Sequence, residues 1–544
     1  MFQRNDGHTQ QRMFSVIDQL PPAVKRRLES SWAHVFYKEY FRRLDETVFS
    51  VLYSAKKSRP NTPVNILVGF ETLKSGFGMS DEQLYDHFLF DMKFRYALGL
   101  HDFDEGHFEL RTIYNFRAAL ATYEADHGVN LIQKATEQIT DEQIEHFQIR
   151  TGLQRMDSAL VQSNIRRMSR LQLLVEIIHR VYRMLSEHEQ AQHEPLFSPY
   201  VKQDSLHYCY KVDRDEAAGR MEQIGRDLAR MLDLFQESYG EQTAYRDAER
   251  VFHEHFRFEE GQIVIKEGAE LNGSCLQSPD DTEATFRTKS GESSRGYVAN
   301  ITETCDSEND LQLITAVSVA PNITDDQHLL ADDVENLKER MPIETLLSDA
   351  GYTGTVAAEA AEKHQVKQKV SGIKGRKKKD PDALGLEDFQ LSTDESGAIS
   401  AIVCPQGNIS EVRPTQKEHR FTAGFDGSKC DICPLKDHCP AKRLQKRNVF
   451  VLRFSTDDLR VARQRQQVAE SGWDVLNMRA SVESTVRSVI HPFGGHLCKM
   501  PVRGRRRIAT MMILSATMVN IRRITRHLFP PIPKKPKIGH PILI

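Results

Sequence analysis

The stretch that decides the fold is residues 296–321, GYVANITETCDSENDLQLITAVSVAP. It contains two apolar segments, GYVANITET (296–304) and LQLITAVSVAP (311–321), and we expect both to be strands. The segment DDVENLKERM (332–341) then predicts a helix, ETLLSDAGYTG (344–354) a third strand ending in a turn, and VAAEAAEKHQ (356–365) another helix. This alternation indicates a layered α/β domain.

A further strand is expected well upstream of this stretch. Residues 151–163, TGLQRMDSALVQS, alternate briefly between apolar and polar side chains, and Asp157 lies in the middle. Helical patterning fills much of the interval that follows, in LQLLVEIIHRVYRMLSEH and AAGRMEQIGRDLARMLDLFQESYG. Because this interval is too long for a loop in a compact domain, we interpret residues 166–269 as a helical insertion.

The rest of the chain adds helices and one polar segment. Residues 1–150 have apolar residues at helical spacing, with Ser80 as a helix cap before Asp81 and Glu82. Residues 371–449 are polar and carry a cysteine cluster. Two helical patterns follow at 456–490 and 506–528, the first with Glu483, and residues 529–544 are expected to be a flexible tail. The predicted α/β domain therefore comprises residues 151–165, 270–370 and 450–528.

The composition is that of a soluble globular protein. Of the 544 residues, 39% are hydrophobic and 27% charged. No apolar run approaches the roughly 20 residues of a membrane helix. The best candidate, residues 508–521, is interrupted by polar residues and predicts a buried core helix. The first residues lack the apolar stretch of a signal peptide, so we expect the chain in the cytoplasm.

The basic residues are unevenly distributed. A net charge of −3 argues against a general nucleic-acid binder, but 12 Lys or Arg and no acid follow Glu483. This leaves 61 of the 73 basic side chains against all 76 acidic ones in residues 1–483. The asymmetry favours a basic C-terminal surface that faces an anionic polymer, although a solvated tail explains the last three lysines equally well. The basic residues within the folded pattern are Lys499, Arg503, Arg505, Arg506 and Arg507.

Three acids have the arrangement that metal-dependent phosphodiester chemistry requires. Asp157 is mid-strand, Asp349 ends a strand where Gly351 and Gly354 allow a sharp turn, and Glu483 lies on a helical pattern in RASVESTVRS (479–488). Two Mg²⁺ ions about 4 Å apart need a few carboxylates on a rigid frame. Each acid alone is more often a structural residue, but the order strand, strand end and helix, with basic residues after it, favours a site.

Several motifs resemble those of the DDE transposases of bacterial insertion sequences, of the insertion-sequence family 1182 type. GMSDEQLYDHFLFDMKFRYALGL with ELRTIYNFRAAL resembles that family's helical leader domain, and RMDSALVQSNI and GYVANI resemble its first two catalytic strands. SDAGYTG resembles the second-aspartate motif, and Arg-x3-Glu with RGRRRIATMMILSATMVNIRRI resembles the glutamate helix and its successor. The resemblance covers most of the chain.

This resemblance implies an α/β fold with a ribonuclease-H-like catalytic domain, a helical N-terminal DNA-binding domain at 1–150, a helical insertion and a cysteine-containing insertion. It implies Asp157, Asp349 and Glu483 as the catalytic acids, holding Mg²⁺ or Mn²⁺, with two ions in each active site. The reaction is hydrolysis at the element's ends, followed by attack of the freed 3′-hydroxyl on target DNA. The partners are double-stranded DNA, as terminal inverted repeats and target, and a second copy in a homodimer or larger assembly. The alternative is a DNA-binding protein derived from a transposase that no longer cuts.

The glutamate motif departs from the family pattern in two places. Some relatives carry Tyr and Lys where this chain has Leu476 and Ile490, while Arg479 is kept. Arg487 or Lys499 is therefore a candidate phosphate contact, beside Arg479 and the later arginines. His491, eight residues after Glu483, lies either near the site or in a structural role.

The four acids around the helix at 332–341 receive a structural interpretation. Asp325, Asp326, Asp332 and Asp333 carry charges that favour the start of a helix, and we do not expect them to be ligands.

Four of the eight cysteines fall within 36 residues. Cys430 and Cys433 form a C-x2-C pair, Cys439 follows, and Cys404 is a fourth candidate ligand, with His438 as an alternative. Four thiolates suit a structural Zn²⁺ that would hold together a polar segment with too little core to fold alone. Reduced thiols without a metal are the alternative interpretation.

Overall fold

Two mixed or antiparallel sheets organise the computed structural model, which describes residues 1–9, 15–54, 56, 59–289, 291–372, 382–394, 399–445, 447–470 and 480–530. The first sheet holds the strands expected around the α/β pattern. Its β1 pairs antiparallel with β5 and parallel with β7, and β6 pairs with β5. The strands are β4 (Thr285–Lys289), β5 (Glu292–Thr304), β1 (Leu153–Gln162), β7 (Thr345–Ser348), β8 (Lys367–Val370) and β6 (Ile314–Pro321).

Helices cover both faces of this sheet. On one face, α14 (Asp326–Arg340) and α15 (Thr355–Lys363) pack against Met156, Val298 and Leu346. On the other face, α19 (Val482–Ile490) and α20 (Arg505–Leu528) pack against Ala159 and Val161. Because successive side chains of a strand point to opposite faces, Asp157 is on the α19 face and Ser158 on the α14 face.

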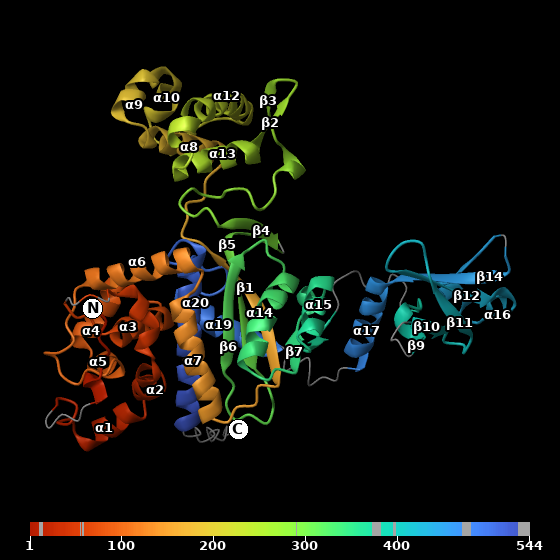
Figure 1. Ribbon diagram of the computed structural model, residues 1–544, viewed down its shortest axis with the longest axis horizontal. Coiled ribbons are helices and arrows are strands. Elements are labelled where there is room, and N and C mark those ends of the chain that lie inside the picture. Colours follow the sequence, from red (N-terminus) through yellow and green to blue (C-terminus); the bar gives the residue numbers. More distant parts are fainter. Residues whose placement is uncertain are drawn as a thin grey trace, which may run out of the picture.

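The N-terminal helices share one apolar core with the sheet. Helix α20 lies between the sheet and α3 (Val64–Phe77), and it also contacts α2 (Trp32–Glu39) and α7 (Leu131–His146) (Figure 1). At Gly76 of α3 a Cβ atom would overlap Met518, so the glycine permits the close approach of the two helices. Burial of the apolar residues of 508–521 confirms the predicted core helix. Residues 1–150 therefore do not form a separate hydrophobic core.

One of the remaining N-terminal helices, α4 (Asp81–Phe90), begins at the cap that the sequence predicts, and another, α6 (Leu110–His127), ends at a glycine. Ser80 and Gln83 form a reciprocal cap, and Gly128 ends its helix in the left-handed conformation at φ 70°. The others are α1 (Pro22–Glu29) and α5 (Met92–Ala97).

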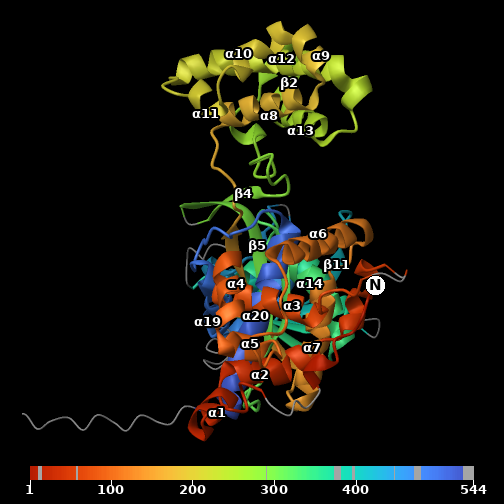
Figure 2. The same ribbon diagram turned by 90° about the vertical axis from the view of Figure 1, so that its left-hand side faces the viewer.

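The predicted helical insertion is a separate lobe with its own apolar core. In both views it stands off from the rest of the molecule, joined by the chain segments next to β1 and β4 (Figure 2). It also contains a hairpin that was not expected, β2 (Phe256–Glu259) with β3 (Gln262–Ile265). Its helices are α8 (Arg170–Met184), α9 (Glu187–Gln192), α10 (Glu194–Val201), α11 (Ser205–Tyr208), α12 (Arg214–Tyr239) and α13 (Thr243–His255).

The polar segment 371–449 folds differently from our expectation. Its described residues form most of a second six-stranded sheet, with Phe389, Ile402, Phe425 and Leu452 in its own core. The expectation of too little core to fold was wrong, because short strands with one buried face expose many polar residues while still burying an apolar row. The strands are β9 (Gln390–Thr393), β10 (Ile399–Val403), β11 (Ile409–Pro414), β12 (Arg420–Asp426), β13 (Lys442–Arg443) and β14 (Val449–Ser455).

Helix α17 (Thr456–Glu470) follows the second sheet. Arg479 and Leu476, which the glutamate motif singles out, lie outside the described residues, as does the tail from residue 531. None of the described helices is long and apolar enough to cross a membrane.

Candidate active site and cysteine cavity

Asp157, Asp349 and Glu483 line a single open cavity of about 690 Å³ at the first sheet. The acids are 192 and 134 residues apart in the sequence, and the fold brings them to the same place. Asp157 and Asp349 are partly buried, whereas Glu483 is exposed. Three carboxylates that line one solvent-accessible cavity can supply oxygen ligands to a metal ion.

The two aspartates owe their proximity to parallel pairing. The register of β1 with β7 ends at Arg155 with Leu347, and Asp157 and Asp349 each come two residues after this last pair. Asp349 comes directly after β7, and its Oδ1 accepts a hydrogen bond from the Gly351 N–H at 2.7 Å. This turn directs the chain away from the sheet while the carboxylate stays at the strand end.

Glu483 is in the first turn of α19, which packs against β1. The helix is anchored through its buried face. Thr485 Oγ1 donates to Glu303 Oε2 at 2.8 Å, and Ser515 Oγ of α20 donates to the Val489 carbonyl at 2.7 Å. These contacts fix the helix against β5 and α20, so that Glu483 and, one turn later, Arg487 point to the exposed side.

Glu303 is the centre of a buried ionic network beneath this helix. Its side chain is fully buried and forms ion pairs with Arg155 Nε and Arg523 Nη1, both at 2.7 Å. Arg523 also donates to Thr485. The network joins β1 and α19, which carry Asp157 and Glu483, to β5 and α20.

Charged residues of both signs complete the cavity wall. Arg487 and His491 come from α19 and the turn after it, and Lys289, Glu292 and His496 come from the β4–β5 hairpin and a later loop. His496 Nε2 lies 3.0 Å from Glu292 Oε2. The structure therefore places His491 at the cavity.

The other predicted DNA contacts in the described part of the chain do not line this cavity. Lys499 is exposed and pairs through its backbone with Gln162 at the end of β1. Arg503 lies 3.2 Å from Asp280, Arg505 3.1 Å from Glu283 and Arg506 4.0 Å from Glu124. Arg507 is exposed and lines a separate cavity of about 270 Å³ between α3, α6 and α20.

The helix-start interpretation was right for Asp325 and Asp326, which lie at the start of α14, and wrong for Asp333, which lies further along the helix. Asp325 caps the helix by accepting from the His328 N–H, as helix-start charges do. Asp326 accepts from Ser158 Oγ at 2.9 Å, and Asp333 accepts from Asn300 and Ser318 at 2.7 and 2.8 Å. Both point at the sheet because they are on the inner side of the helix.

Two side chains between α14 and the first sheet have shifted pKa values. Burial raises the pKa of Asp333 to about 6. Burial also raises the pKa of Tyr352 well above its ordinary value, and the charges of Asp326, Asp157 and Asp349 raise it further. Tyr352 donates to Asn300 Oδ1 at 2.6 Å. The tyrosine is thus a neutral hydrogen-bond donor behind the two aspartates.

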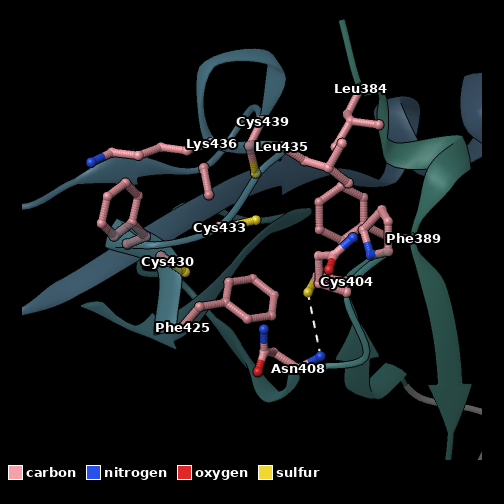
Figure 3. Close-up of a pocket in the computed structure, with 14 residues that line it drawn as sticks. Leu384, Phe389, Cys404, Asn408, Phe425, Cys430, Cys433, Leu435, Lys436 and Cys439 are labelled. Carbon is pink, nitrogen blue, oxygen red and sulfur yellow. Dashed lines mark hydrogen bonds between the residues drawn. The ribbon is translucent and has the colours of Figure 1, made fainter. Parts of the chain in front are cut away.

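The four predicted cysteine ligands surround a second, small cavity of about 30 Å³ in the second sheet (Figure 3). None is in a disulfide. Cys404 Sγ accepts from the Asn408 N–H at 3.4 Å, and Cys439 accepts from the Ala441 backbone. Burial raises the pKa of Cys430 and Cys439, and the neighbouring thiols raise it further. His438, the alternative ligand, does not line this cavity in the described structure.

No group of three or more His, Cys, Asp or Glu side chains within the described ranges is arranged to hold a metal ion. This holds for the three acids and for the four cysteines alike. The side chains of each set line the same cavity, but their ligand atoms do not converge on a common point.

Two comparisons with protein families bear on this geometry. A family model described as "Transposase DDE domain" matches residues 403–525, and one described as "Transposase domain (DUF772)" matches residues 26–119. The first match is to a DDE transposase domain and the second to a transposase domain. The first includes Glu483, all four clustered cysteines and most of α20, and the second spans α1 to α6. A DDE transposase acts on DNA, so the matches support a transposase function with a DNA substrate.

The matched segments together cover less than half of the chain and contain neither Asp157 nor Asp349. No curated protein matches the chain. The mixed helix and sheet architecture is consistent with the α/β fold of a DDE transposase.

The sequence interpretation missed several residues around the cavity of the three acids. Glu303 and Asp326 are acids in otherwise apolar or helix-start positions, and the signal for Glu303 was its place at the inner end of a strand. Lys289, Glu292 and His496 carried no pattern, because their role depends on how two loops meet at the cavity.

Proposed function

We propose that this chain is the transposase of an insertion sequence, of the family 1182 type, with a ribonuclease-H-like catalytic domain built on β1, β5, β6 and β7. Asp157, Asp349 and Glu483 would hold Mg²⁺ or Mn²⁺, two ions per site. The observation that carries the proposal is that three acids from segments 192 and 134 residues apart line one cavity. The order strand, parallel strand end and helix supports the ribonuclease-H-like assignment.

The donor set fits the proposed metal. Carboxylate oxygens are the ligands that Mg²⁺ and Mn²⁺ prefer. Without a cation the three carboxylates repel one another, which agrees with a site that shares a cavity but is not closed. When bound, the metal activates water and stabilises charge on the phosphate. The carboxylates fix where the scissile phosphate lies, and Arg487 extends from the same wall, where it can bind a phosphate oxygen.

The proposed reaction has two steps. Water attacks the phosphorus at the element's end, and the bond to the 3′-oxygen breaks. The freed 3′-hydroxyl then attacks a phosphate of target DNA and forms a new phosphodiester bond, while the bond from that phosphorus to the 3′-oxygen of the target strand breaks and leaves a 3′-hydroxyl there. Because both ends must be joined together, we propose a dimer or larger assembly on two ends. Arg479, Arg487, Lys499, Arg503, Arg505, Arg506 and Arg507 remain the proposed DNA contacts.

A nicking assay with the element's end sequence tests this function. The wild-type protein should cut with Mg²⁺ or Mn²⁺, and it should bind without cutting in Ca²⁺, which coordinates more loosely. The Glu483→Gln variant should bind the ends with unchanged affinity and fail to cut. If the wild-type protein binds but never cuts, the silent DNA-binding alternative is correct instead.

We also propose that Cys404, Cys430, Cys433 and Cys439 bind a structural Zn²⁺. Four thiols from two turns surround a cavity with room for one small ion, and two of them accept backbone N–H groups, which stabilise thiolates. Metal analysis of purified protein should find one zinc per chain. Cys430→Ser should lower the zinc content and loosen the second sheet, with the Mg²⁺ dependence of cleavage unchanged. Protein without zinc and with a normal melting curve would contradict the proposal.

A further inference from the structure

Asp326 makes a contact next to each of the two proposed catalytic aspartates. It is the first residue of α14 and is only 9% exposed. On one side its Oδ1 accepts a hydrogen bond from Ser158 Oγ at 2.9 Å. Ser158 directly follows Asp157 in β1, so the contact restrains the strand at the position of the first aspartate.

The second contact of Asp326 is with the turn that carries Asp349. A Cβ atom on Gly351 would overlap the Asp326 carboxylate, so this carboxylate packs directly against the α-carbon of the glycine. The N–H of the same glycine donates to Asp349 Oδ1 at 2.7 Å. Asp326 therefore touches the residue that orients the second aspartate.

The role of a helix-capping charge does not explain Asp326. Its neighbour Asp325 already caps α14 through the His328 N–H. Nor is Asp326 among the described residues that line the cavity of the three acids, which include Ser158 and Asp349. The side chain lies behind the site, where it links β1 to the turn after β7.

We propose that Asp326 is a positioning residue that fixes the separation and orientation of Asp157 and Asp349 for metal binding. This inference rests on the proposed function. Two acids on neighbouring strands repel, and a rigid link between them reduces the rearrangement that accompanies cation binding. Residues behind metal ligands commonly change metal affinity by about tenfold or more when they are replaced.

Binding of Mn²⁺ to the full chain, followed by the EPR signal of free Mn²⁺, tests the role without depending on cleavage. Asp326→Ala removes both the acceptor for Ser158 and the carboxylate that packs against Gly351, and it should weaken Mn²⁺ binding about tenfold. Asp325→Ala is the matched control, since it removes a carboxylate at the same helix end but leaves the link intact. It should bind Mn²⁺ as the wild-type protein does. Circular dichroism verifies that each variant is folded.

Ser158→Ala separates positioning from charge. It removes the hydrogen bond and keeps the Asp326 charge, so it should reproduce most of the loss, and Ser158→Thr should restore binding. If Ser158→Ala binds normally while Asp326→Ala does not, the effect is purely electrostatic and positioning is excluded. If Asp326→Ala binds normally while Asp157→Asn does not bind, the inference fails and the proposed function stands. If Asp157→Asn binds as the wild-type protein does, the proposed metal site fails, and this inference with it.

Discussion

The two sheets of this molecule place their candidate sites in opposite ways. The acid cavity of the first sheet draws on β1, the end of β7 and α19, which are far apart in the sequence. The four cysteines at the cavity of the second sheet lie within 36 positions of one another. The first site therefore depends on the packing of the whole core, whereas the second depends on local turns.

The sheets also differ in how they treat charge. The first sheet buries Glu303 between two arginines and packs Asp333 against its inner face. The described ion pairs of the second sheet, such as Arg413 with Glu411, are exposed. Charged groups should thus matter more to stability in the first sheet, and each prediction below tests that contrast or the contrast in function.

The largest expected effect is on cleavage. Asp349→Asn removes a charge from the proposed metal site, so the rate of end cleavage should fall by roughly a thousandfold or more, a loss above about 4 kcal/mol in transition-state stabilisation. Cys433→Ser in the second sheet should change the rate less than about threefold. Single-turnover cleavage of a labelled end measures both. Equal losses in the two variants would show that the sheets act as one unit.

The next effect is on the free energy of unfolding. Glu303→Ala leaves Arg155 and Arg523 buried without their carboxylate, which typically costs about 3–5 kcal/mol. Glu411→Ala removes an exposed pair and should cost at most about 0.5 kcal/mol. Urea unfolding with hydrogen exchange of β5 and β12 measures the two costs separately. A loss at Glu303 no greater than that at Glu411 would contradict the buried network.

A smaller effect concerns pH. The folded pKa of Asp333 is about 6, above its unfolded value of 3.8, so the folded state binds the extra proton between these values. Stability of the first sheet should fall as pH rises from 4 to 6, by at most about 3 kcal/mol, and Asp333→Asn should remove this slope.

Asp426 in the second sheet should give stability the opposite dependence on pH. Hydrogen bonds from the Ser428 N–H and hydroxyl lower its pKa, so its contribution is present above the unfolded pKa and is lost as pH falls below it. Hydrogen exchange measured from below the unfolded pKa of Asp426 up to pH 6 distinguishes the two sheets. A first sheet that gains stability as pH rises from 4 to 6 would refute the assignment for Asp333.

The smallest effect is on the salt dependence of DNA binding. Arg507 is exposed, while Arg503, Arg505 and Arg506 lie close to acids. Arg507→Ala should lower the slope of log K against log salt by about 1, and Arg505→Ala should lower it less. Arg453→Ala on the second sheet is the control and should leave the slope unchanged. Should Arg453 change the slope more than Arg507, DNA lies along the second sheet instead.

Strands β1, β5, β6 and β7 of the first sheet could be predicted because their side chains follow the pattern of a strand, whereas β4 and β8 were not predicted. Asp349 was identifiable in the same way, since a buried run followed by Asp and two glycines marks a strand end. The hairpin β2–β3 and the second sheet were not predicted. Their strands are short and their exposed faces carry polar residues such as Arg413 and Arg453, which conceal the alternation.

The shared cavity of the three acids could be proposed from order alone, but their support could not. Glu303 and Asp326 act through contacts with residues 148 and 168 positions away, at Arg155 and Ser158. No spacing rule connects such positions. The same limit explains why the ion pairs of Arg503 and Arg505 with Asp280 and Glu283 were not foreseen.

The position of α20 has a consequence for synthesis on the ribosome. The helical insertion has a contiguous core, so it can fold as soon as residue 276 has left the exit tunnel. The N-terminal helices are made earlier, yet they bury their apolar faces against a helix that begins at Arg505. Their final packing must wait until most of the chain has been translated. A nascent chain that stops before this helix would expose that apolar surface, and it would become a target for chaperones or proteases.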